Sequence, residues 1–185
     1  TISLNGFLTQ DMIPDVKSIS GDLMGNILQG SLNKNKSALL TELDAKATFL
    51  DLKDINLKDV KAVLSFINGK VAVKPFTLKH KDISVQIAGS HGFDQNMDYN
   101  LKFDVPVKYL GNDVNKLLAK VTPADAKKIE GVPVNAMMSG NFKSPKLTTD
   151  VQQASKNVAS QLIQLQKEKL VQKGTGVLTT ILNGN

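Results

Sequence analysis

The residues best suited to chemistry lie in the stretch GSHGFDQNMDYNLKFDVPV, residues 89–107. It contains His91, one of two histidines in the chain, followed by Asp94, Asp98 and Asp104. A histidine close to carboxylates is what a metal site or general acid–base catalysis requires. The competing interpretation is a tight turn that leads into a strand, because Asp, Asn and Gly also satisfy the backbone of turns.

The positions of the two histidines argue against a site. His80 and His91 fall at opposite ends of one predicted strand, and at about 3.3 Å per residue they lie roughly 36 Å apart. They cannot share a metal ion, and no Glu lies near His91. Asp94 and Asp98 belong to a predicted connector, GFDQNMD at 92–98. We therefore expect a turn there, with no metal and no cofactor.

Other catalytic patterns are also missing from the sequence. It has no GxSxG, no P-loop, no GxGxxG after a strand and no HExxH. It has no cysteine, which excludes disulfides and thiolate chemistry. No pair of carboxylates stands out. The sequence favours a protein that is not an enzyme, and a hydrolase on an unrecognised carboxylate site remains an alternative.

The composition restricts the class of partner. The chain has 185 residues and a net charge of +6, and all of its basic residues are lysine. Nucleic-acid readers usually need Arg for bidentate contacts, so nucleic acid is disfavoured. The dispersed lysines predict a solvated surface, with attraction to anionic lipid headgroups as the weaker alternative. No apolar run approaches the ~20 residues of a membrane span. Since the chain opens on TISLNGFLTQ without Met, we expect a soluble fragment of a longer protein.

Period-2 alternation of apolar residues predicts a long antiparallel meander. Strand side chains alternate between the two faces, and four segments between residues 60 and 109 show this pattern. Asn-Gly at 68–69 predicts a hairpin turn, Pro75 a bulge, and Pro106 an edge or a bulge near the end of the last strand. The resulting apolar face contains Ile83, Val85, Ile87, Tyr99, Leu101, Phe103, Val105 and Val107, with Tyr109 continuing the last strand.

From these patterns we predict an α+β fold that is mainly antiparallel β. The sheet is a curved meander, shaped as a groove or half-barrel, with three or four helices packed on or beside it. We expect a single domain over residues 1–185. Its segments are glycine-rich strands at 1–32, a helix at 33–48, the meander at 49–110, helices at 111–131, closing strands at 132–149 and a long C-terminal helix at 150–173, capped by Asp150 and ended by Gly174. The first helix has Leu39, Leu40 and Leu43 on one face, and a short helix starts with Thr122 as its cap and Pro123 in its first turn. The C-terminal helix has an apolar stripe of Val151, Ala154, Val158, Leu162 and Leu165.

The apolar sheet face is the candidate functional surface. In one interpretation it is core, and the helix at 150–173 packs over it. In the other, part of the face stays open to a hydrophobic ligand such as a lipid acyl chain. The aliphatic composition fits both.

A family resemblance bears on both interpretations of this face. The segment FINGKVAVKPFTLKHKDISVQIAGSHGFDQNMDYNLKFDVPVKYLG, with GVPVNAMMSGNFKSPKLTTD after it, resembles the C-terminal region of AsmA-like proteins of the bacterial envelope, particularly the long forms of Bacteroidetes. The resemblance covers about residues 1–165. It implies a periplasmic domain of a protein anchored in the inner membrane by one N-terminal helix and related to TamB. The implied role is outer-membrane assembly or phospholipid transport.

The partners implied by the resemblance are a phospholipid or another acyl-chain ligand, together with envelope proteins. The eight apolar residues of the sheet face would then contact lipid. A second hypothesis keeps the envelope location but makes the domain a protein-interaction module or a structural end-cap that does not bind lipid.

Overall fold

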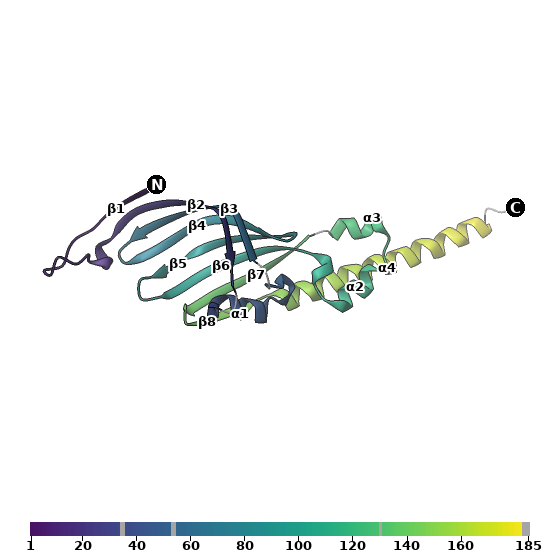
Figure 1. Ribbon diagram of the computed structural model, residues 1–185. Helices are drawn as coiled ribbons and strands as arrows, with labels where there is room; N and C mark the ends of the chain where they lie inside the picture. Colours follow the sequence, from purple (N-terminus) through teal and green to yellow (C-terminus); the bar gives the residue numbers. More distant parts are fainter. Residues whose placement is uncertain (34–35, 53–54, 130, 183–185) are drawn as a thin grey trace. The chain divides into compact units, whose positions relative to one another are not determined.

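The computed structural model describes residues 1–33, 36–52, 55–129 and 131–182, with side chains as far as Val171. It has the predicted α+β fold, in which an open antiparallel sheet of eight strands follows chain order (Figure 1). The strands are β1 (Ile2–Asn5), β2 (Ser20–Leu32), β3 (Ile55–Ile67), β4 (Lys70–His80), β5 (Ile83–Gly92), β6 (Asn96–Pro106), β7 (Gly131–Asn141) and β8 (Ser144–Thr149). The α-helices are α1 (Ala38–Lys46), α2 (Asn112–Leu118), α3 (Pro123–Ala126) and α4 (Val151–Leu182).

The chain divides into two compact units. The first consists of Thr1–Asp104 and Pro133–Asp150, and it holds most of the sheet together with α1. The second consists of Val105–Val132 and the residues from Val151 onward, and it holds α2, α3 and α4. Each unit is described by itself below.

Strands β3 to β6 form the predicted four-strand meander. Asn68 and Gly69 both have positive φ, at 50° and 73°, as the predicted Asn-Gly hairpin turn requires. The register between β4 and β5 shifts between Val73 and Phe76, which confirms the bulge at Pro75. Both sides of the bulge pair with alternate residues of β5 that share one face. Phe76 and Leu78 therefore point to the same face of the sheet as Val71 and Val73.

Two local predictions for this meander are wrong. The connector at 92–98 is shorter than expected, because β5 continues to Gly92 and β6 begins at Asn96. The turn closes tightly because Gln95 takes a φ of 70° and its N–H donates to the Gly92 carbonyl. The last strand also ends earlier, since β6 stops at Pro106 and residues 107–109 form a 3₁₀ turn. Proline has no N–H for a further ladder bond.

Helix α1 occupies the interior of the segment predicted as a helix at 33–48. Ser37 is the N-cap, and its side chain accepts a hydrogen bond from the N–H of Leu40 at 3.3 Å. A 3₁₀ turn, Thr48–Leu50, follows and buries Phe49 and Leu50. Residues 34–35, which belong to the same prediction, lie outside the described residues. Below, the α1 segment means residues 38–52.

The helices of the second unit are tied together by Asp125. Thr122 caps α3 with Pro123 at its first position, as predicted, and its hydroxyl donates to the Asp125 carboxylate at 2.7 Å. Lys128 and Lys169, the latter from α4, form ion pairs with this buried carboxylate. The hydrogen bond from Lys169, followed by those from Thr122 and Lys128, holds the pKa of Asp125 well below its usual range.

Helix α4 begins directly after Asp150, the predicted cap residue. The Asp150 carboxylate also accepts hydrogen bonds from the backbone N–H and side-chain amide of Asn135, at 2.7 and 2.8 Å. Gly174 does not end the helix, because the helix runs to Leu182. A glycine inside a helix costs only about 1 kcal/mol, which neighbouring turns can offset. Its buried stripe of Ala154, Val158 and Leu162 follows the predicted spacing.

Candidate functional site

The predicted apolar face exists and is mostly buried. Ile83 and Val105 are fully buried, whereas Ile87 and Tyr99 are half-buried. Val85, Leu101 and Phe103 are at most 7% exposed. All but Val105 and Val107 belong to the first unit; those two are buried as well, but they belong to the second unit. The face is therefore core at one end and partly accessible around Ile87 and Tyr99.

The first unit contains an apolar cavity of about 300 Å³ between this face and the α1 segment. Among the residues that line it, only Lys79, His80 and Tyr99 are polar. The sheet side of the lining includes Leu57, Leu78, Val85, Ile87, Tyr99, Leu101 and Phe103; the α1 segment contributes Leu39, Leu40, Leu43, Leu50 and Leu52. The cavity is partly open to the surface, and its apolar walls give water few hydrogen-bond partners.

The α1 segment covers the cavity but does not pack tightly enough to fill it. The three leucines of α1 are only half-buried, and no residue of the helix is fully buried. The 3₁₀ turn that follows is packed tightly, with the Phe49 ring edge-on to Phe103 at a centroid distance of 5.4 Å. One end of the segment is thus fixed to the core, while the helix itself lies over unfilled space.

Polar contacts fasten the α1 segment to the β4–β5 turn. His80 donates from Nε2 to the backbone carbonyl of Leu50 at 3.0 Å. Lys81 makes a salt bridge to Asp51 with an Nζ–Oδ2 distance of 2.7 Å. His80, one of the two histidines considered for chemistry, therefore holds the cover of the cavity in place.

His91 lies in strand β5, as predicted, whereas His80 ends strand β4, so the two histidines do not lie at opposite ends of one strand. It pairs with Met97 of β6 and Val71 of β4 and points to the same face as Tyr99. Its Nδ1 is hydrogen-bonded to the Tyr99 hydroxyl at 2.7 Å, and its ring meets the Phe142 ring at a centroid distance of 5.2 Å. Burial lowers the pKa of His91 and raises that of Tyr99. Both groups are therefore neutral at neutral pH.

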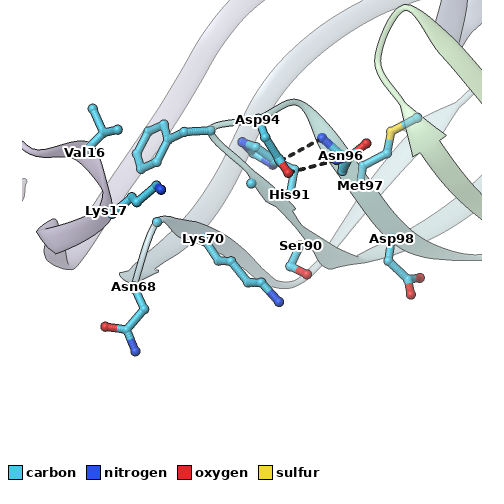
Figure 2. A pocket seen from close by; sticks show the side chains of 13 residues that line it. Val16, Lys17, Asn68, Lys70, Ser90, His91, Asp94, Asn96, Met97 and Asp98 are labelled. Atoms are coloured by element: carbon cyan, nitrogen blue, oxygen red, sulfur yellow. Dashed lines mark hydrogen bonds between the residues drawn. The ribbon is translucent and has the colours of Figure 1, made fainter.

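A second, polar pocket of about 820 Å³ opens at the end of the sheet beside His91 (Figure 2). Figure 2 shows Lys70, Ser90 and Asp98 pointing to one side of the sheet, away from Asp94 and Asn96. The backbone N–H and side-chain amide of Asn96 donate to the Asp94 carboxylate at 3.1 and 2.8 Å. These bonds lower the pKa of Asp94. Asp94 thus serves the turn, as the turn interpretation expects.

The carboxylates of the opening stretch do not converge on His91. Asp98 and Asp104 alternate with the apolar residues of β6 and point to the opposite face of the sheet. Within the described part of the chain, no group of three or more His, Asp or Glu side chains is placed to hold a metal ion. The arrangement around His91 is a histidine–tyrosine hydrogen bond packed against the Phe142 ring, and the aspartates of the stretch lie outside it.

The half-buried His91, whose pKa is lowered by desolvation, should make stability depend on pH. Above its ordinary pKa of about 6.5, the folded and unfolded chains are both neutral at this residue. As pH falls below that value, the unfolded chain takes up the proton first, so unfolding becomes easier. We expect the melting temperature to fall between pH 7.5 and 5, and His91→Gln to reduce that fall. His80→Gln is the matched control, and an equal effect from it would contradict the assignment.

Sequence patterns did not reveal the residues that cover the cavity. Leu39, Leu40 and Leu43 form the predicted apolar face of a helix, but nothing in the sequence indicates that α1 lies against β8 and that these leucines line a cavity together with residues of β4 to β6. The run FLDL at 49–52 provides three further buried residues. Its apolar alternation was the available signal. One interpretation has the helix at 150–173 as the cover; within the second unit, this helix packs against α2.

Comparisons with known proteins give no relative for this chain. No protein family, no curated protein sequence and no solved structure matches it significantly. Among the described helices, none combines the length and the apolar character that crossing a bilayer requires. The function is therefore inferred from the cavity and the sheet.

Proposed function

We propose that the chain is a non-enzymatic, lipid-binding domain of an AsmA-like envelope protein, which holds a single acyl chain between its sheet and the α1 segment. The observation that carries this proposal is the apolar cavity beneath α1. At about 300 Å³ it is at the lower end of the range of ligand pockets, about 300–1,000 Å³. This size suits one apolar chain better than the two chains of a diacyl lipid.

The residues that line the cavity favour an acyl chain as the ligand rather than a polar molecule. The cavity walls are mostly leucine, isoleucine and valine, and they offer few groups that could orient a polar molecule. Burial of each methylene stabilises a bound chain by about 0.8 kcal/mol without any specific polar contact. The half-buried Ile87 and Tyr99 lie where such a chain would replace solvent. Residues Ile83, Val105 and Val107, by contrast, serve as core.

The resemblance to envelope proteins implies a cellular role for lipid binding by this domain. On the resemblance to AsmA-like proteins, the domain belongs to a periplasmic protein anchored in the inner membrane, which assists outer-membrane assembly or phospholipid transport. Envelope proteins would be its partners. The cavity is compatible with that role because a carrier must shield acyl chains from water.

Filling the cavity should abolish binding. Ile87→Trp places a large ring in the cavity from a half-buried position, and Gln86→Trp places the same ring on the exposed opposite face of β5. We expect the purified chain to bind a fluorescent fatty acid, Ile87→Trp to bind it at least ten-fold more weakly, and Gln86→Trp to bind it unchanged. Thermal melting verifies that both variants fold.

Lipid extraction followed by mass spectrometry provides the independent measurement. A co-purified acyl lipid, depleted in Ile87→Trp but retained in Gln86→Trp, supports the proposal. No extractable lipid together with no probe binding by the unaltered chain would contradict it. That outcome would favour the structural end-cap, in which the covered sheet only terminates the domain.

A further inference from the structure

The turns of the sheet gather at one end of the first unit. In an antiparallel meander, alternate connections lie at the same end, here the β1–β2 connection and the β3–β4, β5–β6 and β7–β8 turns (Figure 1). Backbone hydrogen bonds link these turns: Phe93 N–H donates to the Gly69 carbonyl at 3.2 Å, and Phe142 N–H to the Gln95 carbonyl at 3.0 Å. We refer to this as the turn end of the sheet.

The β1–β2 connection extends from the turn end as a small hydrogen-bonded hairpin, residues 7–14, which we call the apolar finger. Its tip closes with Met12 N–H donating to the Thr9 carbonyl at 3.0 Å and Thr9 N–H to the Ile13 carbonyl at 2.8 Å. Met12 has a φ of 61°, which completes the reversal. At its base, Phe7 N–H donates to Ser18 Oγ at 2.7 Å. The finger therefore has a defined shape of its own.

This shape holds four large apolar side chains in solvent. Phe7 is 76% exposed, Met12 74%, Ile13 61% and Leu8 54%. Single exposed apolar residues are ordinary, but a contiguous group on a projecting element marks an interaction site. The turn end adds further exposed apolar side chains, those of Val16, Ile67 and Phe93.

Lysines flank this apolar group. Lys17, Lys70 and Lys143 are exposed at the turn end, and no salt bridge within the described part of the chain engages them. The acidic residues at this end are Asp11, Asp15, Asp94 and Asp98, and Asp98 lines the same pocket as Lys17 and Lys70. Asp15 accepts the N–H of Lys17, and Asp94 accepts from Asn96, so these two carboxylates also stabilise turns. Lysine stems can follow apolar surface while their ammonium groups reach anionic headgroups.

We propose that the turn end is a membrane-docking surface, on which the apolar finger inserts into the interfacial layer of an anionic phospholipid bilayer while Lys17, Lys70 and Lys143 contact the headgroups. Apolar side chains flanked by lysines are the pattern of interfacial insertion. A protein partner is a poorer fit, because a stable interface takes about 20–30 residues a side and the finger presents four side chains. This docking does not depend on whether the cavity holds a ligand.

The absence of tryptophan from the chain allows a direct test. Phe7→Trp places a single fluorophore on the finger, and Met24→Trp places one at a 62% exposed position on β2. With vesicles of phosphatidylglycerol and phosphatidylethanolamine, we expect the Phe7→Trp emission to shift to the blue and to be quenched by brominated acyl chains. The Met24→Trp emission should do neither. Equal responses, or no response at position 7, would overturn the proposal.

Vesicle sedimentation tests the contribution of the apolar finger and that of the lysines separately. Phe7→Ser with Met12→Ser should weaken binding at least ten-fold, whereas Met24→Ser with Leu28→Ser, equally exposed on β2, should not. Lys17→Gln with Lys70→Gln should weaken binding to anionic vesicles by about five-fold per lysine, and added salt should reduce that difference. Lys58→Gln with Lys61→Gln is the control pair on β3.

Two results would identify a different occupant of the turn end. If the Phe7→Trp emission shifts with protein concentration in the absence of vesicles, the finger is a contact between copies of this chain and the proposal is wrong. If the finger variants bind vesicles as the unaltered chain does, the exposed side chains serve a protein partner instead. Failure of fatty-acid binding in the cavity changes neither expectation.

Discussion

Replacing Phe103 with Asp is expected to unfold the first unit. Phe103 is 3% exposed, it packs edge-on against Phe49, and it lines the apolar cavity. Loss of a buried phenylalanine costs about 3–5 kcal/mol, and a buried carboxylate without a partner adds several more. Since whole domains are stable by about 5–15 kcal/mol, little or no folded protein should remain. Circular dichroism and thermal melting measure this directly.

Lys102→Asp provides the matched control for this substitution. Lys102 precedes Phe103 on β6 and faces solvent, so the same new carboxylate stays hydrated there. We expect the control to melt within a few degrees of the unaltered chain. A folded Phe103→Asp protein that had lost only its fatty-acid binding would show that the face at this position is an open groove rather than core.

Replacing Gly89 with Ala should have the second largest effect. A Cβ built at this position would lie 2.6 Å from the Tyr99 Cα and would also overlap the Asp98 carbonyl oxygen. These are backbone atoms of the neighbouring strand, so β5 and β6 would have to move apart. Overpacking of this kind typically costs about 1–3 kcal/mol. It should also displace Tyr99 and weaken its hydrogen bond to His91.

Gly25→Ala is the control, because a Cβ at Gly25 would meet nothing closer than a leucine methyl at 3.5 Å. We expect it to leave the melting temperature unchanged or slightly raised, since alanine reduces the freedom of the unfolded chain. The two variants should separate clearly in a melting experiment. Similar losses at both positions would mean that glycine matters in these strands for backbone freedom rather than for close approach.

The sequence predicted local structure well where local chemistry decides it. The hairpin at Asn68–Gly69, the bulge at Pro75 and the Thr122 cap of α3 each depend on the preferences of one or two residues. The boundary errors arose where a residue adopted a less favoured conformation. Gln95 takes a positive φ that glycine or asparagine would have signalled, so the β5–β6 turn is tighter than its composition indicates.

The candidate site was only partly predictable. Alternation identified which residues of β5 and β6 share a face, and it placed Val85, Leu101 and Phe103 together correctly. It could not show which of them line a cavity and which are core, because that depends on what packs above each one. The long apolar stripe of the C-terminal helix is the stronger sequence signal for a cover, but within the first unit the leucines of α1 line the cavity.

The stretch at residues 89–107 shows which features the sequence determines and which features only the tertiary structure determines. By itself the sequence determined that Tyr99, Leu101 and Phe103 share one face, because strand geometry alternates side chains whatever lies nearby. Only the tertiary structure decided that His91 bonds Tyr99, that α1 leaves a cavity over this face, and that the apolar finger stays in solvent. Burial depends on contacts between segments that are far apart in the sequence. The sequence of one such segment does not indicate which other segment will pack against it.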